Sequence, residues 1–149
     1  MKILIANLGS TSFKYRLFDV SAETDTSGDE RELARGGVER IGSQESRVYA
    51  SLDNEAAQVN QIETIQPIPN HGVALEAAMT QLTAEGGPLS SIADVAAIGF
   101  KAVHGGKAGG VVRVNDSVLD AMEEMADVAP AHNPPYVKAM KQLAERFPN

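Results

Sequence analysis

Two strand-like segments lie on either side of a short polar turn at the start of the chain. Residues 3–6, Ile-Leu-Ile-Ala, form an unbroken apolar run, which predicts a strand buried on both faces. From Phe13 to Leu17, apolar residues alternate with Lys14 and Arg16, which predicts a strand with one solvated face. Because so few residues separate the two segments, we expect a β-hairpin, and the fold must include a sheet that begins at the N-terminus.

The turn of this hairpin has the composition of an anion-binding loop. Gly9 lets the backbone approach a ligand closely, and the hydroxyls of Ser10, Thr11 and Ser12 can surround phosphate oxygens together with nearby N–H groups. Lys14 supplies a positive charge. The same residue types are common in ordinary turns, and the segment is neither a Walker A loop nor a dinucleotide-binding fingerprint. From these residues alone, a phosphate-binding turn and a plain hairpin turn are both open.

The middle of the chain predicts an antiparallel continuation of this sheet. The polar segment 21–30 is expected to be a loop. Residues 32–38 and 47–52 alternate in the manner of strands and are expected to extend the hairpin into a meander. The stretch 53–70 is polar, contains two prolines, and is expected to lead into a helix.

Three helices are expected, each with a polar residue at its start. The first is capped near Asn70, the second by Asn115 or Asp116, and the third by Asn133 with Pro134 at the first helical position. Their spacing predicts buried stripes made of Val73, Leu75, Ala78, Met79 and Leu82, then Val118, Leu119, Met122 and Met125, then Val137, Met140, Leu143 and Ala144.

Two further strands are expected between the first and second helices. Residues 95–103 are mostly apolar without a helical stripe, which predicts a buried strand, and residues 111–114 predict a short one. The first of these ends at His104 and two glycines, a position where α/β sheets often bind ligands. We expect His104 to be structural and to hold the Gly-Gly turn.

Composition narrows the class of protein. With 149 residues, 43% of them hydrophobic, the chain is long enough for one globular domain but not for a second complete one. The net charge of −7 disfavours nucleic acid or an anionic membrane as a partner. The absence of cysteine excludes disulfides and thiolate metal sites, and the three histidines are too widely spaced for a local zinc motif. No apolar stretch approaches membrane-spanning length, so we expect a cytoplasmic protein that begins at its native start.

Four motifs follow one another along nearly the whole chain. They are Asn-Leu-Gly-Ser-Thr-Ser-Phe-Lys at 7–14, Val-Glu-Arg-Ile-Gly at 38–42, Gly-Phe-Lys-Ala-Val-His-Gly-Gly at 99–106 and Ala-Pro-Ala-His-Asn-Pro at 129–134. In this order the chain resembles the acetate kinase family of acyl-phosphate-forming kinases, which share the fold of sugar kinases, actin and the large heat-shock chaperones.

The resemblance implies an incomplete α/β domain of the actin-like ATPase (ribonuclease H-like) type. Its sheet is expected to be mixed, with an antiparallel meander and flanking helices. In the family, a strand with a catalytic aspartate and then a whole second domain follow the fourth motif. Residues 1–149 are therefore expected to be the N-terminal part of the first domain, either a cloned fragment of a longer gene or a truncated gene product. An uncovered sheet edge would then favour a homo-oligomer.

The resemblance also implies a reaction and assigns residues to it. The reaction is the reversible transfer of the γ-phosphoryl group of ATP to acetate or a similar short-chain carboxylate, with Mg²⁺, giving acyl phosphate and ADP. Asn7 would serve the metal, while Ser10, Ser12 and Lys14 would bind the phosphates. His132 would face the transferring phosphoryl group; without the resemblance, a histidine that merely packs near a helix start would be the simpler interpretation.

The third and fourth motifs depart from the family at the expected acyl site. Lys101 replaces an arginine that binds the carboxylate and the phosphoryl group, and lysine cannot form the bidentate contact of arginine. Phe100 replaces a histidine, and Ala131 replaces a pocket leucine, whereas Val103 is retained. The smaller Ala131 makes propionate or butyrate alternative substrates. These departures also support a rival hypothesis, a non-catalytic relative that binds a phosphate, a carboxylate or a partner.

Overall fold

The computed structural model describes residues 1–20, 30–53, 59–101, 104–107 and 109–146. These residues form six strands, three α-helices and one short 3-10 helix. They fall into two compact units: Met1–Asn7 with Thr11–Phe100, and Leu8–Ser10 with Lys101–Asn149.

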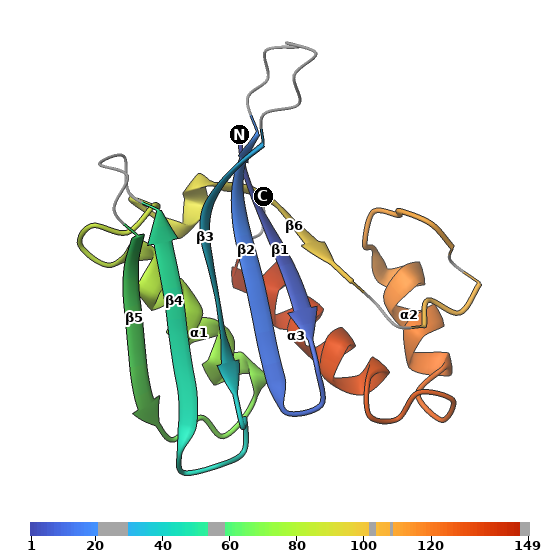
Figure 1. Ribbon diagram of the computed structural model, residues 1–149. Helices are drawn as coiled ribbons and strands as arrows, with labels where there is room; N and C mark the ends of the chain where they lie inside the picture. The colour runs from blue at the N-terminus through green and yellow to red at the C-terminus, as the bar shows by residue number, and fades with distance from the viewer. Residues whose placement is uncertain (21–29, 54–58, 102–103, 108, 147–149) are drawn as a thin grey trace. The chain divides into compact units, whose positions relative to one another are not determined.

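The first unit is built on a mixed six-stranded sheet, as expected (Figure 1). Its strands lie in the order β5-β4-β3-β2-β1-β6, in which β2 to β5 are antiparallel neighbours and β6 pairs with β1 in parallel. Their bounds are β1 (Lys2–Leu8), β2 (Ser12–Val20), β3 (Glu30–Glu39), β4 (Ser46–Asp53), β5 (Val59–Gln66) and β6 (Val95–Phe100).

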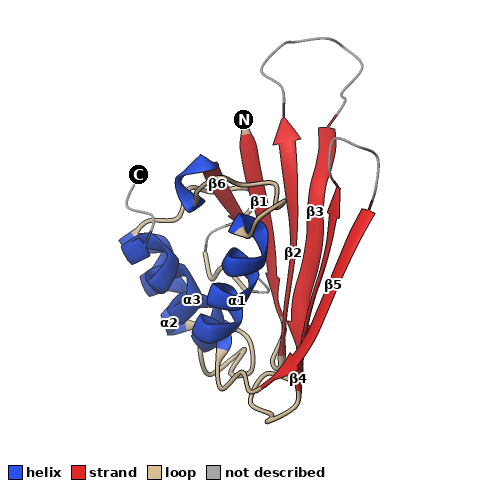
Figure 2. Ribbon diagram, turned by 90° about the vertical axis from the view of Figure 1, so that its left-hand side faces the viewer, coloured by secondary structure: helices blue, strands red, loops and turns tan. Residues whose placement is uncertain are grey.

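One face of the sheet is covered by helix α1 (His71–Thr83), which packs on β2, β3 and β4 (Figure 2). The helix begins where expected, because the side chain of Asn70 accepts a hydrogen bond from the backbone N–H of Val73 at 3.1 Å. The core lies between them and comprises Leu4, Ala6, Phe13, Tyr15, Leu17, Val38, Val48, Ala50 and Leu52 from the sheet and Ala74, Leu75, Ala78, Met79 and Leu82 from the helix.

Strand β1 is buried on one face only, so the prediction of burial on both faces was wrong. Leu4, Ala6 and Leu8 are buried, but Ile5 is 41% exposed. Strand β6 is likewise not a buried strand: it ends at Phe100, and Ala96 and Ala97 are exposed. Both errors have one cause, because an unbroken apolar run does not reveal how many faces of its sheet are covered.

One strand was not predicted, and one predicted strand is absent. The polar stretch 53–70 leads into a helix as expected, but it also contains strand β5, whose side chains are mostly exposed and which is held by backbone pairing with β4. Residues 111–114 form no strand, and their side chains are exposed. β5 is a strand because its backbone pairs with β4, whereas residues 111–114 pair with none of the described strands. Such pairing is hard to predict from a half-polar sequence. The predicted loop over 21–30 lies almost wholly outside the described residues.

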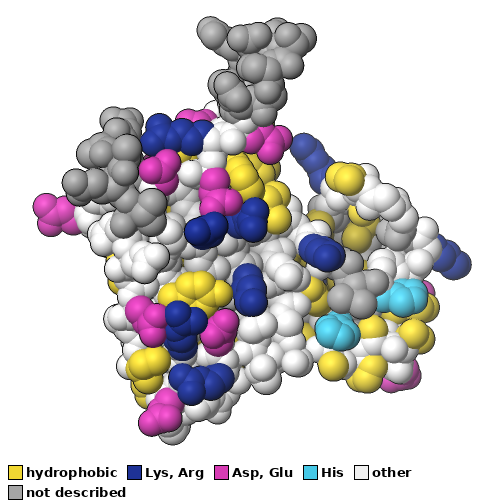
Figure 3. Space-filling model, viewed as in Figure 1, with side chains coloured by type: hydrophobic (Ala, Val, Ile, Leu, Met, Phe, Trp, Pro, Cys, Tyr) yellow, Lys and Arg dark blue, Asp and Glu magenta, His cyan; other side chains and the backbone are white. Residues whose placement is uncertain are grey.

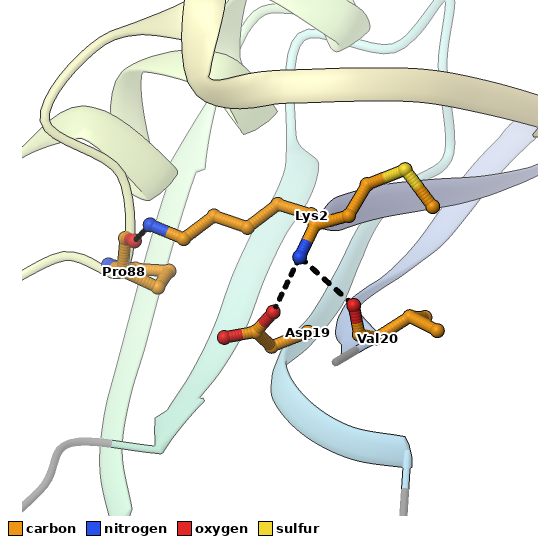
Figure 4. Close-up of polar contacts among 5 residues, drawn as sticks. Lys2, Asp19, Val20 and Pro88 are labelled. Atoms are coloured by element: carbon orange, nitrogen blue, oxygen red, sulfur yellow. Dashed lines mark hydrogen bonds and ion pairs between the residues drawn. The ribbon is translucent and has the colours of Figure 1, made fainter. Parts of the chain in front are cut away.

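The N-terminus is tied into the first unit by three polar contacts (Figure 4). The amino group of Met1 lies 3.1 Å from Asp19 Oδ1 and donates to the carbonyl of Val20 at 2.8 Å. The ammonium group of Lys2 donates to the carbonyl of Pro88 at 2.8 Å. These contacts hold the start of β1 against the end of β2 and against the segment that precedes β6.

The second unit contains helices α2 (Asp116–Glu124) and α3 (Asn133–Arg146), which pack against each other. Asn115 caps α2 as expected, since its side chain accepts from the N–H of Val118 at 3.0 Å. The predicted stripe of α3 is largely correct, but Ala144 is exposed. The core of this unit comprises Leu119, Met122, Tyr136, Val137, Ala139, Met140 and Leu143.

Candidate functional site

The β1–β2 turn presents hydroxyl groups to solvent. Ser10 and Thr11 are exposed, and Ser12 is half-buried at the first position of β2. The carbonyl of Thr11 accepts a hydrogen bond from the N–H of Ile41 at 2.9 Å, which ties this end of the hairpin to the turn after β3. Hydroxyl and backbone groups so placed can bind the oxygens of an anion.

Asn7 and Lys14 meet in one groove on the outer face of the first unit's sheet. The groove has a volume of about 730 Å³, and its lining includes Asn7 from β1, Lys14 and Arg16 from β2, and Arg35 from β3. Ser12 lies two residues from Lys14 and therefore on the same face of β2. The residues expected at the phosphate end, apart from Ser10, thus occupy neighbouring positions on one surface.

Most of the cations along this groove are already paired with carboxylates. Arg47 lies 3.3 Å from Glu39 and 2.7 Å from Glu63, and its guanidinium stacks 4.6 Å from the ring centroid of Tyr49. The hydrogen bond from Arg47 lowers the pKa of Glu63. Figure 3 shows basic and acidic side chains interspersed over this face.

Lys14 is the exception among the basic residues of the groove. Arg16 and Arg35 both lie near Glu32, at 3.5 and 3.9 Å, whereas Lys14 forms no ion pair with any described residue. Its exposed ammonium group is therefore the positive charge in the groove that is most available to an anionic ligand.

In the second unit, the segment after β6 carries Lys101 and a tight glycine turn. Lys101 is exposed, and Val103 lies outside the described residues. The backbone N–H of Gly106 donates to Nδ1 of His104 at 3.3 Å, so His104 holds the glycine turn as expected. Gly106 has a φ of +63°, and a Cβ there would lie 2.8 Å from the carbonyl oxygen of Ala121, so this position favours glycine.

His132 precedes α3 and is half-buried, next to the exposed Ala131. Its Nδ1 atom is buried and has no hydrogen-bond partner among the described residues. A buried N–H group without a partner is rarer in folded proteins than a buried acceptor without one, which favours the tautomer that carries its proton on Nε2. The ring can then donate one hydrogen bond from Nε2.

Asn133 does not cap α3, contrary to the sequence-based expectation. It is the first residue of the helix and is fully buried. Its Nδ2 donates to two carbonyls, those of His104 at 3.0 Å and Met122 at 2.8 Å, while Oδ1 is buried without a partner in the described part of the chain. The residue type and position favour a cap, and only the tertiary structure reveals the different role.

Sequence reasoning also missed Tyr136, one turn further along α3. Its side chain is 1% exposed, and burial raises the pKa of its phenol, although a hydrogen bond with the backbone of Leu8 opposes this shift. Leu8 directly precedes the turn that carries Ser10, so α3 contacts this turn as well as the segment at His104. A buried aromatic residue on a helical stripe carries no local signal of such a contact.

The chain has relatives along its entire length. Residues 2–149 match the acetokinase family. The chain belongs to this family. It is 39% identical to the acetate kinase of Carboxydothermus hydrogenoformans over 151 residues, which cover 100% of this chain and 35% of the relative. It is 38% identical to the acetate kinase of Bacillus cereus, with 99% and 34% of the two chains covered. The chain thus spans about a third of the length of these relatives.

Solved structures of acetate and propionate kinases have a fold similar to that of this chain. The crystal structure of Porphyromonas gingivalis acetate kinase is similar with a TM-score of 0.80 and 29% identity, over 97% of this chain and 34% of that one. A propionate kinase from Francisella tularensis, 22% identical, matches with a TM-score of 0.77 over 99% of this chain and 34% of its own, which supports the fold alone. The expected fold class is therefore confirmed. None of the described helices has the length and apolar character needed to cross a membrane.

Proposed function

We propose that the chain is the N-terminal part of the first domain of an acetate kinase-like phosphotransferase. The reaction would be reversible transfer of the γ-phosphoryl group of ATP to acetate or a similar short-chain carboxylate. The observation that most directly supports this is the groove in which Asn7 meets Lys14, whose ammonium group has no ion pair within the described residues.

The phosphate end would be formed by the β1–β2 hairpin. Hydroxyl groups of Ser10 and Ser12, the amide of Asn7 and the ammonium of Lys14 are all suited to stabilising negative charge on phosphate oxygens. In phosphoryl transfer, the charge spreads over these oxygens in the transition state, so donors fixed beforehand lower the barrier.

The acceptor end would be formed by residues of the second unit. A carboxylate is already ionised at neutral pH, so its attack on phosphorus needs positioning and charge neutralisation rather than a general base. Lys101 would neutralise the carboxylate, and Val103 and Ala131 would contact its acyl group. His132 would donate from Nε2 to an oxygen of the transferring phosphoryl group.

The chain's own residues fit the two cofactors unequally. ATP would supply the phosphoryl group, and the donors of the hairpin suit its phosphates. Mg²⁺ is usually held by one or two carboxylates together with phosphate oxygens, and none of the residues assigned to the phosphate end is an Asp or Glu. Asn7 alone does not make a magnesium site, so we assign no step of the reaction to the ion.

A second candidate function is ligand binding without turnover. Lys101 favours it, because a lysine at an oxyanion site keeps the charge of the family's arginine but loses the bidentate geometry. The two functions differ in whether an acyl phosphate is formed, and an assay can distinguish them.

The decisive experiment replaces the matching third of the Carboxydothermus hydrogenoformans acetate kinase with this chain. The chimaera is assayed for acyl phosphate with acetate, propionate and butyrate. We expect turnover with at least one acid, and we expect Lys14→Ala to lower it by about a hundredfold because a charge-stabilising donor is lost. A folded chimaera that is inactive with all three acids would favour the binding function.

The 149-residue chain alone is expected to form no acyl phosphate above a blank without protein. It would hold the γ-phosphoryl group from one side only. Product formation by the chain, abolished by Lys14→Ala and hence not due to a contaminating kinase, would contradict this expectation.

A further inference from the structure

The first turn of α3 contacts two segments that the proposed function places at the reacting groups. We propose that Asn133 and Tyr136 are positioning residues, which fix the segment at His104–Gly106 and the turn at Leu8–Ser10 to the helix that begins beside His132. This inference rests on the proposed function and adds two residues to it that touch neither substrate.

Asn133 contributes through hydrogen bonds that do not serve its own helix. A helix-starting asparagine normally accepts from the N–H groups of the first turn, but here the amide group donates to the carbonyls of His104 and Met122. The oxygen of the same amide is left buried without a partner in the described residues, which is unfavourable. The two prolines that follow Asn133 have no N–H for this oxygen to accept from, so the contacts with the two carbonyls are what the residue supplies.

Tyr136 provides the second contact, three residues after Asn133 in the same helix. Its phenol is buried and hydrogen-bonded to the backbone of Leu8, two residues before Ser10. Its own N–H donates to the carbonyl of His132 at 3.1 Å, so the two residues are joined by a helical hydrogen bond. The turn that carries Ser10 is thus connected to His132 through one side chain and one backbone contact.

The segment between these two residues is stiff. Pro134 and Pro135 follow Asn133 directly, and each proline ring fixes its backbone φ angle near the helical value. A rigid first turn would transmit the positions of both contacts to His132. The two contacts come from different side chains and reach different segments, so we expect the loss of one contact to loosen its own segment and to leave the other segment held to the helix.

The test uses amide hydrogen exchange and ligand titration by NMR on the whole 149-residue chain. The variants are Asn133→Ala and Tyr136→Phe, with Lys138→Ala, an exposed position on α3, as the matched control. Urea unfolding establishes that each variant is folded. Acetate and inorganic phosphate serve as separate probes.

Each variant should affect one segment. Asn133→Ala should speed exchange at Gly105 and Gly106 by at least about tenfold and weaken the response of Lys101 to acetate. Tyr136→Phe should do the same at Leu8–Ser10 and weaken the response of Ser10 to phosphate. In each variant, amide exchange and ligand response in the other segment should be the same as in the Lys138→Ala control. General destabilisation would instead alter both segments together.

Unchanged exchange in both variants, or equal changes at both segments, would overturn the inference. If Asn133→Ala does not fold, the Tyr136→Phe result decides, because that change removes only a hydroxyl group. A wild-type chain that responds to neither ligand would count against the proposed function, while its exchange pattern would still decide whether the two contacts anchor their segments.

Discussion

At the scale of single residues, Tyr15 carries a buried hydroxyl group that has no hydrogen-bond partner among the described residues. A buried polar group without a partner lowers stability by about 1–3 kcal/mol. We predict that Tyr15→Phe, which removes only this hydroxyl, raises the free energy of unfolding by about 1 kcal/mol. Urea unfolding measures the change, and a loss of stability would show that the hydroxyl has a partner.

The same residue should make stability depend on alkaline pH. Burial, with a smaller contribution from Tyr49, raises the pKa of Tyr15 above its usual value of 10.0. The unfolded chain therefore loses this proton first as the pH rises, so stability is complete below about pH 10 and falls above it. Tyr15→Phe should reduce this fall, and an unchanged pH profile would contradict the assignment.

Lys101 and Ala131 should determine how well the proposed enzyme uses acetate. In the chimaera, Lys101→Arg should restore a bidentate contact worth about 1.5–3 kcal/mol, which raises catalytic efficiency with acetate about tenfold to a hundredfold. Ala131→Leu should shift preference toward the shorter acid by about 1–3 kcal/mol, because the larger side chain would leave less room for the acyl group. Since both residues would contact one ligand, the two effects need not add.

Kinetics with acetate, propionate and butyrate test this prediction. If the parent chimaera is active and Lys101→Arg lowers its efficiency with every acid, the site is adapted to lysine and the argument from geometry fails. If neither the parent nor the double variant acts on any acid, the binding function is favoured.

The sequence suggested candidate phosphate-binding groups, but not the residues that we propose position them. Asn7, Ser10, Ser12 and Lys14 could be proposed because their residue types suit phosphate and because they lie close together along the β1–β2 hairpin. Asn133 was interpreted as a cap, and Tyr136 was not identified. Both act through contacts with residues far away in the sequence, and no local pattern encodes such contacts.

At the scale of secondary structure, two consecutive glycines allow β3 to lie between tyrosines of its neighbours. A Cβ on Gly36 would collide with the carbonyl oxygen of Tyr49 and would lie 2.6 Å from the hydroxyl of Tyr15. The ring of Tyr15 on β2 thus occupies the space that a side chain on Gly36 would fill, and the hydroxyl of Tyr49 on β4 lies 3.2 Å from the position of a Cβ on Gly37.

Gly36→Ala should therefore destabilise the first unit by about 1–3 kcal/mol or more, because the backbone of β4 has to move. Gly109→Ala is the matched control, since a Cβ there has no atom within 4 Å. The control should change stability by less than about 0.5 kcal/mol in urea unfolding. Equal effects at both positions would show that the cost comes from backbone entropy and not from crowding.

The strands that could be predicted from the sequence are those in which apolar and polar residues alternate, because this pattern indicates one buried face. β2, β3 and β4 have this pattern, and α1 and α2 have clear caps at Asn70 and Asn115. β5 was missed because its side chains are mostly exposed, so its place in the sheet depends on backbone hydrogen bonds that any sequence can form.

At the scale of the whole molecule, the chain combines a sheet-based unit with a helical one and spans about a third of its relatives' length. Among the described strands, β6 has a single neighbour, β1. β6 consists of Val-Ala-Ala-Ile-Gly-Phe and contains no charge, whereas β5 at the other end contains Glu63. Uncharged edge strands tend to pair with another chain, so β6 is the edge more prone to self-association.

We therefore predict that the 149-residue chain forms a dimer or larger species through β6. Ala97 is exposed on this strand, and Ala97→Lys should shift the protein toward the monomer because a charge on an edge strand opposes pairing. Thr64→Lys, at an exposed position on β5, is the matched control and should leave association unchanged. Sedimentation over a range of concentrations measures both. A strict monomer at high concentration would refute self-association, and dissociation by Thr64→Lys alone would assign it to the opposite edge of the sheet.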